Sequence, residues 1–390
     1  MRVLVAHTFY RNPGGEDRYV RQQVSLLSTR HDVRLLSRTN VNLKQSIRTA
    51  ARMTFSARER SAVDRAIDTF RPDVIHLHNP YPSFGPVVHL AAAAHGIPLV
   101  VTAHNFRLRC PNGLMFTEGG PCRRCEDGAY ANAILHHCFV ARSQSLAYAS
   151  ALWMHRFVFR LEQMVDVFIA PSRFMSERLE RWGIAPDRVA LVRNYTDIEP
   201  GSAEPGTSGM YLGRLSKEKG VDVLLRALRA AGDPPFRIVG DGPAAGSLRA
   251  LAAELRLHNT VFTGLVERDQ VVRELRDARF VAFPSSWDEN APLAALEAMA
   301  AGRPLLVTRV GGLNELVEEG AGLSCAVGDV AAIGHAIGVL MGDDHLCRLA
   351  GARGVARARA EFSPARHLER LEEVYRAIVV PARSTVTHAG

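Results

Sequence analysis

The chain has 390 residues, 47% of them hydrophobic and 23% charged, so it has the composition of a soluble globular protein too long for one compact core. Its formal net charge of +8 leaves phosphorylated ligands, anionic lipid surfaces and nucleic acid open as partners. The basic residues are spread through predicted helices, and no zinc-finger, RRM or KH signature occurs. We therefore expect no nucleic-acid partner.

The sequence enters an apolar strand at Val3–Ala6, with no leader of signal-peptide length before it. No apolar run approaches the roughly 18–20 residues that span a bilayer. We expect a cytoplasmic protein, either free or peripheral on the inner face of the membrane.

Predicted strands alternate with predicted helices through the first half of the chain. The strands are expected at residues 3–7, 31–37, 72–79, 98–102, 166–170 and 189–192, and the helices at about 16–27, 58–70, 85–95 and 172–183. This alternation predicts a parallel sheet with helices on both faces.

Polar residues follow several of these strands. His7, His78 and His104 come at or just after a strand's carboxyl end, and Asn105 follows His104. A single histidine in such a place is usually a structural hydrogen bonder, but three at one sheet edge indicate a pocket. Paired glycines, Gly14–Gly15, follow the first strand and would let the backbone approach a ligand, although such turns are more often structural.

Residues 105–140 interrupt the alternation and hold four of the six cysteines. Cys110, Cys122, Cys125 and Cys138 lie there, with His136–His137 close by. In a reducing compartment these residues suggest a structural zinc site, made of four thiolates or of three with one histidine. Four unrelated thiols remain an equal alternative, because the outer spacings match no zinc ribbon.

Residues 143–164 read as one helix rich in large apolar and basic residues. Most of these apolar side chains are expected to lie in the core. The many Trp, Phe and Arg residues make an interfacial membrane contact a second expectation for this helix. Residues 199–208 then lose all periodicity in a run of Gly, Pro, Ser and Glu, which predicts an interdomain linker.

The second half restarts with a strand at residues 209–213 and a charged turn before a helix that begins at Val221. Arg214 and Lys219 flank this turn, and together with free N–H groups at the helix start they suit a diphosphate. A further strand ends in a Gly-rich turn at Gly240, which is not a dinucleotide fingerprint.

A buried strand at residues 279–283 leads into a polar loop that carries Glu289 and Asn290. Pro292 sits where a helix starts, and Glu297 lies inside that helix about two turns after Glu289. At the carboxyl edge of a parallel sheet, two such carboxylates can accept hydrogen bonds from several hydroxyls of one extended ligand. A nucleotide-sugar offers these hydroxyls on its sugar and its ribose.

The spacing from Glu289 to Glu297 resembles the E-x7-E motif of the retaining GT-B glycosyltransferases of family 4. The runs Gly213-Arg214-Leu215 with Lys219-Gly220, Val239 to Pro243, and Cys110 to Gly113 are similar to that family as well. The resemblance implies an α/β GT-B fold, with two doubly wound Rossmann-like domains facing a central cleft. It implies an acceptor-binding domain at 1–198 with a Cys-rich insertion at 105–140, a linker at 199–208, a nucleotide-sugar-binding domain at 209–362, and a last helix with a tail at 363–390 that crosses back to the first domain.

The resemblance also assigns roles to residues. Catalytic roles fall to His104, Glu289, Arg214 and Lys219. Donor binding falls to Gly14, Gly15, Gly213, Arg214, Lys219, Gly240, Asn290, Pro292, Leu293 and Glu297, and the acceptor side to Glu16, His78 and Asn105. Asn105 departs from the family, which usually has Asp there. Since no Asp-x-Asp motif occurs, we expect no cofactor in catalysis.

The implied activity is transfer of a sugar from a nucleoside-diphosphate sugar to a glycan or lipid-linked acceptor, with retention, in cell-surface polysaccharide or glycolipid biosynthesis. Two alternatives remain: a GT-B nucleotide-sugar epimerase, and a non-catalytic module that binds nucleotide-sugars. The residues leave the base, the sugar and the acceptor open.

Overall fold

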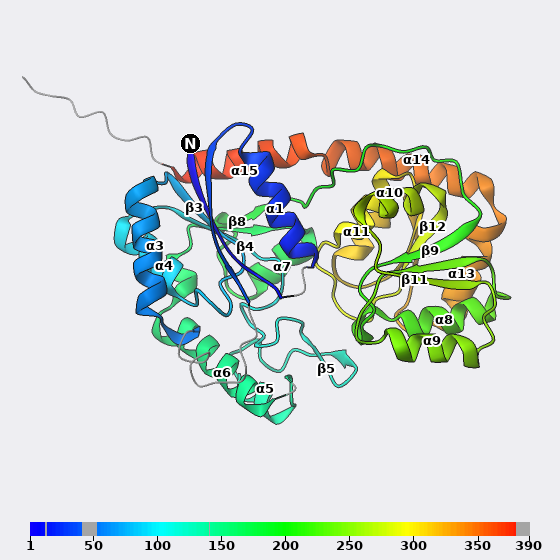
Figure 1. Ribbon diagram of the computed structural model, residues 1–390, viewed down its shortest axis with the longest axis horizontal. Helices are drawn as coiled ribbons and strands as arrows, with labels where there is room; N and C mark the ends of the chain where they lie inside the picture. Colours follow the sequence, from blue (N-terminus) through cyan, green and yellow to red (C-terminus); the bar gives the residue numbers. More distant parts are fainter. Residues whose placement is uncertain (12–13, 41–52, 140, 380–390) are drawn as a thin grey trace, which may run out of the picture.

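The structure, a computed structural model, describes residues 1–11, 14–40, 53–139 and 141–379. Two parallel sheets of six strands each stand side by side, each flanked by helices (Figure 1). This is the predicted α/β class with two doubly wound sheets. No helix among the described residues combines the length and the apolar character needed to cross a membrane.

The first sheet is formed by the N-terminal half, with strand order β2-β1-β3-β4-β7-β8. Its strands are β1 (Arg2–Phe9), β2 (Asp32–Thr39), β3 (Val74–Leu77), β4 (Leu99–Thr102), β7 (Val167–Ala170) and β8 (Val189–Leu191). Its helices are α1 (Gly15–Leu27), α3 (Ala57–Phe70), α4 (Val87–His95) and α7 (Arg173–Arg181). Successive strand residues point to opposite faces: Val3 and Val5 pack on the side of α1, whereas Leu4 and Ala6 pack on the side of α3 and α4.

The second sheet has the order β11-β10-β9-β12-β13-β14. Its strands are β9 (Ser208–Leu212), β10 (Phe236–Val239), β11 (Thr260–Gly264), β12 (Ala278–Phe283), β13 (Leu305–Thr308) and β14 (Gly322–Cys325). Its helices are α8 (Val221–Ala230), α9 (Ala245–Glu254), α10 (Arg268–Asp277), α11 (Leu293–Ala300), α12 (Asn314–Val317) and α13 (Val330–Gly342). Every residue of β12 is buried, as expected for a central parallel strand covered on both faces.

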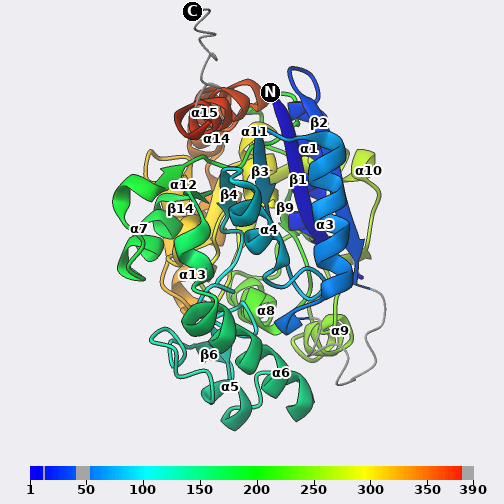
Figure 2. The ribbon, with the colours of Figure 1, turned by 90° about the vertical axis from the view of Figure 1, so that its left-hand side faces the viewer.

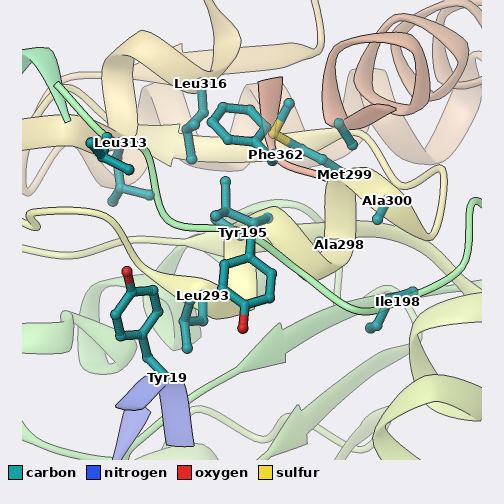
Figure 3. Packing of buried hydrophobic residues seen from close by; sticks show 14 of the residues in the cluster. Tyr19, Tyr195, Ile198, Leu293, Ala298, Met299, Ala300, Leu313, Leu316 and Phe362 are labelled. Carbon is teal, nitrogen blue, oxygen red and sulfur yellow. The ribbon is translucent and has the colours of Figure 1, made fainter. Parts of the chain in front are cut away.

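One apolar core joins the two sheets. It takes Tyr19 from α1, Tyr195 from the segment after β8, Leu293 from α11, and Phe362, which directly follows the helix α14 (Asp344–Glu361) (Figure 3). Because these residues are buried together, the two halves of the chain meet through packed side chains.

The C-terminal helices span both halves. Helix α14 (Asp344–Glu361) packs against α11, and α15 (Pro364–Ile378) then runs along the first sheet (Figures 1 and 2). The hydroxyl of Tyr375 lies 2.6 Å from Nδ1 of His76, and Glu372 lies 3.1 Å from Nε2 of His31.

The helix expected at residues 143–164 is not continuous, so that prediction was wrong in part. Helix α6 (Arg142–Trp153) passes into a π-helical turn, η1 (Met154–Val158), and Arg160 has a left-handed backbone with φ of 50° before the 3-10 turn η2 (Leu161–Met164). Buried His155 explains the wider turn: its ring bonds to the Tyr81 hydroxyl at 2.6 Å and the Met53 carbonyl at 2.9 Å. The remaining elements of this region are short: β5 (Phe116–Thr117), β6 (Gly120–Pro121) and α5 (Asn132–Leu135).

Candidate active site

The loops after strands of the two sheets meet between the two halves of the chain. The side chain of Asn290, after β12, donates to the carbonyl of Ala103 at 2.7 Å and accepts from the Ser172 hydroxyl at 2.8 Å. Ala103 and Ser172 follow β4 and β7 of the other sheet. Asn290, expected to bind the donor, therefore holds the two halves together.

Lys219 and Glu289 form an ion pair at this junction. The Lys219 ammonium lies 2.5 Å from Oε1 of Glu289, which also accepts from the Ser285 hydroxyl at 2.6 Å. Glu289 is only 5% exposed. Gly220, with φ of 65°, fixes this position, because a Cβ there would lie 2.1 Å from the Pro284 carbonyl oxygen. The predicted cationic turn thus contacts the predicted acidic loop.

Glu297 lies in the same helix-loop unit, inside α11, and is 3% exposed. Its Oε1 accepts from Arg18 of α1 and from Arg268 of α10, the latter at 2.6 Å. Arg268 also pairs with Asp197 at 2.5 Å. Oε2 of Glu297 has no hydrogen bond among the described residues, so it can still accept one from a ligand hydroxyl.

Arg214 stands apart from these pairs. Its side chain is exposed and has no ion pair or hydrogen bond within the described part of the chain. The neighbouring backbone is tightly packed: a Cβ on Gly240 would lie 1.9 Å from the carbonyl oxygen of Gly213. The structure therefore brings Lys219, Glu289 and Glu297 into contact networks, and leaves Arg214 free to bind an anion.

The glycine pair lies opposite the start of α11. Gly14 caps α1, and Gly15 begins it. A Cβ on Gly15 would lie 3.9 Å from Cδ1 of Leu293, the first residue of α11 after the capping Pro292. The N-terminus of α1 and the N-terminus of α11 therefore face each other across the junction, and both supply free N–H groups that favour anions.

His104 and His78 form a buried pair at the edge of the first sheet. Nδ1 of His78 lies 2.8 Å from Nε2 of His104, whose ring meets Tyr19 edge-on at a centroid distance of 5.0 Å. Burial, and next the neighbouring histidines, lower the pKa of both rings well below the ordinary range. Both rings are therefore neutral near pH 7, and one nitrogen of the pair donates to the other.

Glu16 and Asn105 meet beside this pair. The Asn105 amide donates to Oε2 of Glu16 at 3.2 Å, and the Tyr10 hydroxyl donates to the same oxygen at 3.2 Å. Oε1 of Glu16 is buried with no partner in the described residues. Burial raises the pKa of Glu16, and the charges of His7 and Arg107 oppose the rise.

The four clustered cysteines, Cys110, Cys122, Cys125 and Cys138, line one cavity in the segment between β4 and α6. None forms a disulfide. Burial, and then the nearby thiols, raise the pKa of Cys125 to about 12. In the described part of the chain, no three Cys, His, Asp or Glu side chains are arranged to hold a metal ion. Zinc binding by these residues stays a prediction, which the metal content of the purified protein would decide.

Several residues at the junction were not found from the sequence. Arg18 and Arg268 bind Glu297, yet Arg18 is 279 positions away from it in the chain. Ser285 binds Glu289, and its place four residues earlier in the same loop is a usable signal. For Arg18 the signal is weaker: it is an arginine in the first turns of the helix that follows Gly14–Gly15.

The arrangement can hold a ligand that carries both negative charge and hydroxyl groups. Lys219, Arg214 and two helix N-termini can bind phosphate oxygens, while Oε2 of Glu297 and the Glu289 carboxylate can accept from hydroxyls.

Comparison with known proteins agrees with this geometry. Residues 13–200 match the family described as Glycosyltransferase Family 4, and residues 200–355 match Glycosyl transferases group 1. The D-inositol 3-phosphate glycosyltransferase of Nocardia farcinica (strain IFM 10152) is 35% identical, over 51% of this chain and 49% of that protein. Glycogen synthase of Mycobacterium tuberculosis (strain CDC 1551 / Oshkosh) is 29% identical, over 70% of this chain and 61% of that protein. The chain thus spans about half to three fifths of the length of these relatives.

Solved structures share the fold. Sucrose-phosphate synthase from Thermosynechococcus elongatus is similar with a TM-score of 0.67 at 18% identity, over 97% of this chain and 98% of that one. Anabaena Alr3699/HepE, in complex with UDP-glucose, gives a TM-score of 0.68 at 19% identity, over 97% and 100%. The fold is therefore GT-B, as the sequence predicted. With two adjoining matches that together run from residue 13 to residue 355, the chain belongs to the group 1 glycosyltransferases of family 4.

Proposed function

We propose that this protein is a retaining glycosyltransferase that moves a sugar from a nucleoside-diphosphate sugar to an acceptor hydroxyl, in the synthesis of a cell-surface polysaccharide or glycolipid. The observation that carries the proposal is the joint placement of Lys219, Glu289 and Glu297 at one edge of the second sheet, in contact with the first. Family membership supports the same reaction class.

In the proposed reaction the acceptor oxygen bonds to the anomeric carbon as the bond from that carbon to the diphosphate breaks. Lys219 and Arg214 stabilise the negative charge that grows on the leaving diphosphate, as preorganised groups do. The acceptor attacks on the face from which the diphosphate leaves, so the configuration is retained, and a phosphate oxygen on that face takes the acceptor proton. His104 contacts the reacting sugar, Glu289 its hydroxyls, and Glu297 the ribose.

A nucleotide screen tests the donor assignment. Anabaena Alr3699/HepE was solved with UDP-glucose, so a UDP-sugar is our first candidate, with GDP- and ADP-sugars as rivals. We expect one class to raise the melting temperature, because a ligand at about 100 times its Kd stabilises the native state by about 2.7 kcal/mol. If no nucleotide of the three classes shifts the transition, the proposal is wrong.

The same purified protein also distinguishes the transferase from the two alternative functions. An epimerase would convert the donor when no acceptor is present, and a binding module would leave donor and acceptor unchanged. A transferase forms a new glycoside only when both are supplied, which NMR of the mixture would follow. The Glu16–Asn105 contact beside His104 supports an acceptor site and therefore the transferase.

We also propose that the region around α6 touches an anionic membrane surface. Leu146, Trp153, Phe157 and Val158 are each at least 45% exposed there, on the helices at the lower end of Figure 2. Residues 132–160 hold three arginines and no Asp or Glu, and exposed apolar side chains beside cations favour anionic lipid.

Vesicle flotation tests this contact. We expect the protein to float with vesicles containing phosphatidylglycerol and less with purely neutral ones, and Trp153→Ser with Phe157→Ser to lose most of the binding. The control is Leu265→Ser, because Leu265 is 84% exposed in the other half of the chain. Equal flotation of the double variant and the control would contradict the proposal.

A further inference from the structure

A second cavity lies in the N-terminal half, beside His104. It is bounded by the ends of β3 and β4, by α4, and by the turns η1 and η2, and it holds about 730 Å³ of empty space counted out to its mouth. Ala103, in its wall, is the residue to which Asn290 donates. The cavity therefore adjoins the candidate donor site on the side where an acceptor must enter.

Arg107 lines this cavity, and the charge of Glu16 acts on it without a direct ion pair. The guanidinium forms no ion pair and no hydrogen bond among the described residues, and its Nε is buried without an acceptor. It lies between two aromatic faces, 5.6 Å from the Tyr81 ring and 5.5 Å from the Tyr148 ring. A guanidinium has five N–H donors, and a buried donor without an acceptor, such as Nε here, is costly. An anion in the cavity would be able to accept hydrogen bonds from this guanidinium.

Among the residues that the structure describes, the other charges in the cavity wall are one cation and one carboxylate. Arg156 is the cation, and the carboxylate of Glu162 accepts from both terminal nitrogens of Arg109. His89 and His155 are neutral near pH 7, because burial lowers their pKa to about 3 and about 4. The lining therefore carries two cations against one carboxylate that is already bound.

We propose that this cavity is the acceptor site and that Arg107 selects acceptors carrying a phosphate or carboxylate group near the reacting hydroxyl. The inference rests on the proposed transferase function. The anion binds the planar fork of Arg107, which matches both groups in two-point geometry. The reacting hydroxyl then lies toward His104 and Asn105, which line the wall next to Ala103, the residue that Asn290 contacts.

Calorimetric titration of three probes tests the inference. Glucose 1-phosphate carries a phosphate, glucuronate a carboxylate, and glucose neither. We expect at least one anionic probe to bind the wild-type protein ten times more tightly than glucose, and Arg107→Gln to lose that advantage. Arg107→Lys keeps the charge without the fork and should retain part of it. Arg65→Gln, in an exposed part of α3, is the matched control and should leave all three affinities unchanged.

Titration of UDP, GDP and ADP into the same variants separates this inference from the proposed function. If a nucleotide binds the wild type and Arg107→Gln equally well, the donor site is intact, and any loss of anion binding belongs to Arg107. If a nucleotide binds but glucose matches both anions, or neither anion binds, or Arg107→Gln keeps the preference, the inference is wrong while the proposed function stands. If no nucleotide binds, the proposed function fails.

Discussion

Replacing Lys219 with alanine is expected to lower kcat for sugar transfer by about 10²–10³-fold, which corresponds to about 2.7–4 kcal/mol of transition-state stabilisation. Lys219 forms an ion pair with Glu289 and is half-buried. Little water therefore screens its positive charge at the leaving diphosphate. The measurement is the rate of nucleoside-diphosphate release with saturating donor and acceptor.

Lys217→Ala is the matched control, because Lys217 lies two residues earlier in the same turn, is exposed and forms no ion pair in the described residues. It should keep most of the wild-type rate. Removing Lys219 also leaves the buried Glu289 side chain with Ser285 as its one hydrogen-bond partner in the described part of the chain, so the melting temperature of each variant must be recorded. A folded Lys219→Ala protein with the rate of the control would show that the diphosphate binds elsewhere.

Replacing Glu297 with glutamine is expected to weaken nucleotide binding by about 10- to 100-fold, because hydrogen bonds to a charged group contribute about 1.5–3 kcal/mol. The open Oε2 of Glu297 is the acceptor for a ribose hydroxyl in this account. The measurement is calorimetric titration of the nucleotide that gives the largest thermal shift.

Glu254→Gln provides the comparison, because Glu254 is an exposed helix residue on α9. Loss of the Glu297 charge also weakens its pairs with Arg18 and Arg268, whose side chains are about one third exposed, 37% and 32%. We therefore expect a lower melting temperature together with the weaker binding. Unchanged nucleotide affinity in a folded Glu297→Gln protein would remove the ribose assignment.

The central strands of the fold could be predicted from local patterns in the sequence. The buried strands β3, β4 and β12 are short apolar runs that end in polar loops, and each was expected within a few residues of where it lies. A continuous apolar run identifies such strands, because the sheet is covered on both faces. Periodicity did not reveal the break after α6, because His155 owes its buried position to Tyr81 and Met53, which are far away in the chain.

Some residues of the candidate site could likewise be predicted from local sequence, and others could not. Lys219 and Glu289 could be named because each sits in a recognisable local motif. Arg18, Arg268 and Arg107 could not, since an arginine in a helix or loop carries no local sign of the partner that it meets or lacks. The cavity proposed to bind the acceptor could not be predicted either, because its wall is assembled from segments between residues 77 and 168.

The most direct test of the central claim is a crystal structure of this protein with the best-binding nucleotide-sugar. We predict that the diphosphate binds Lys219 and Arg214, that the ribose hydroxyls bind Oε2 of Glu297, and that the sugar lies between Glu289 and His104. A nucleotide bound away from the junction of the two sheets, with Lys219 and Glu297 still paired only to protein, would contradict it.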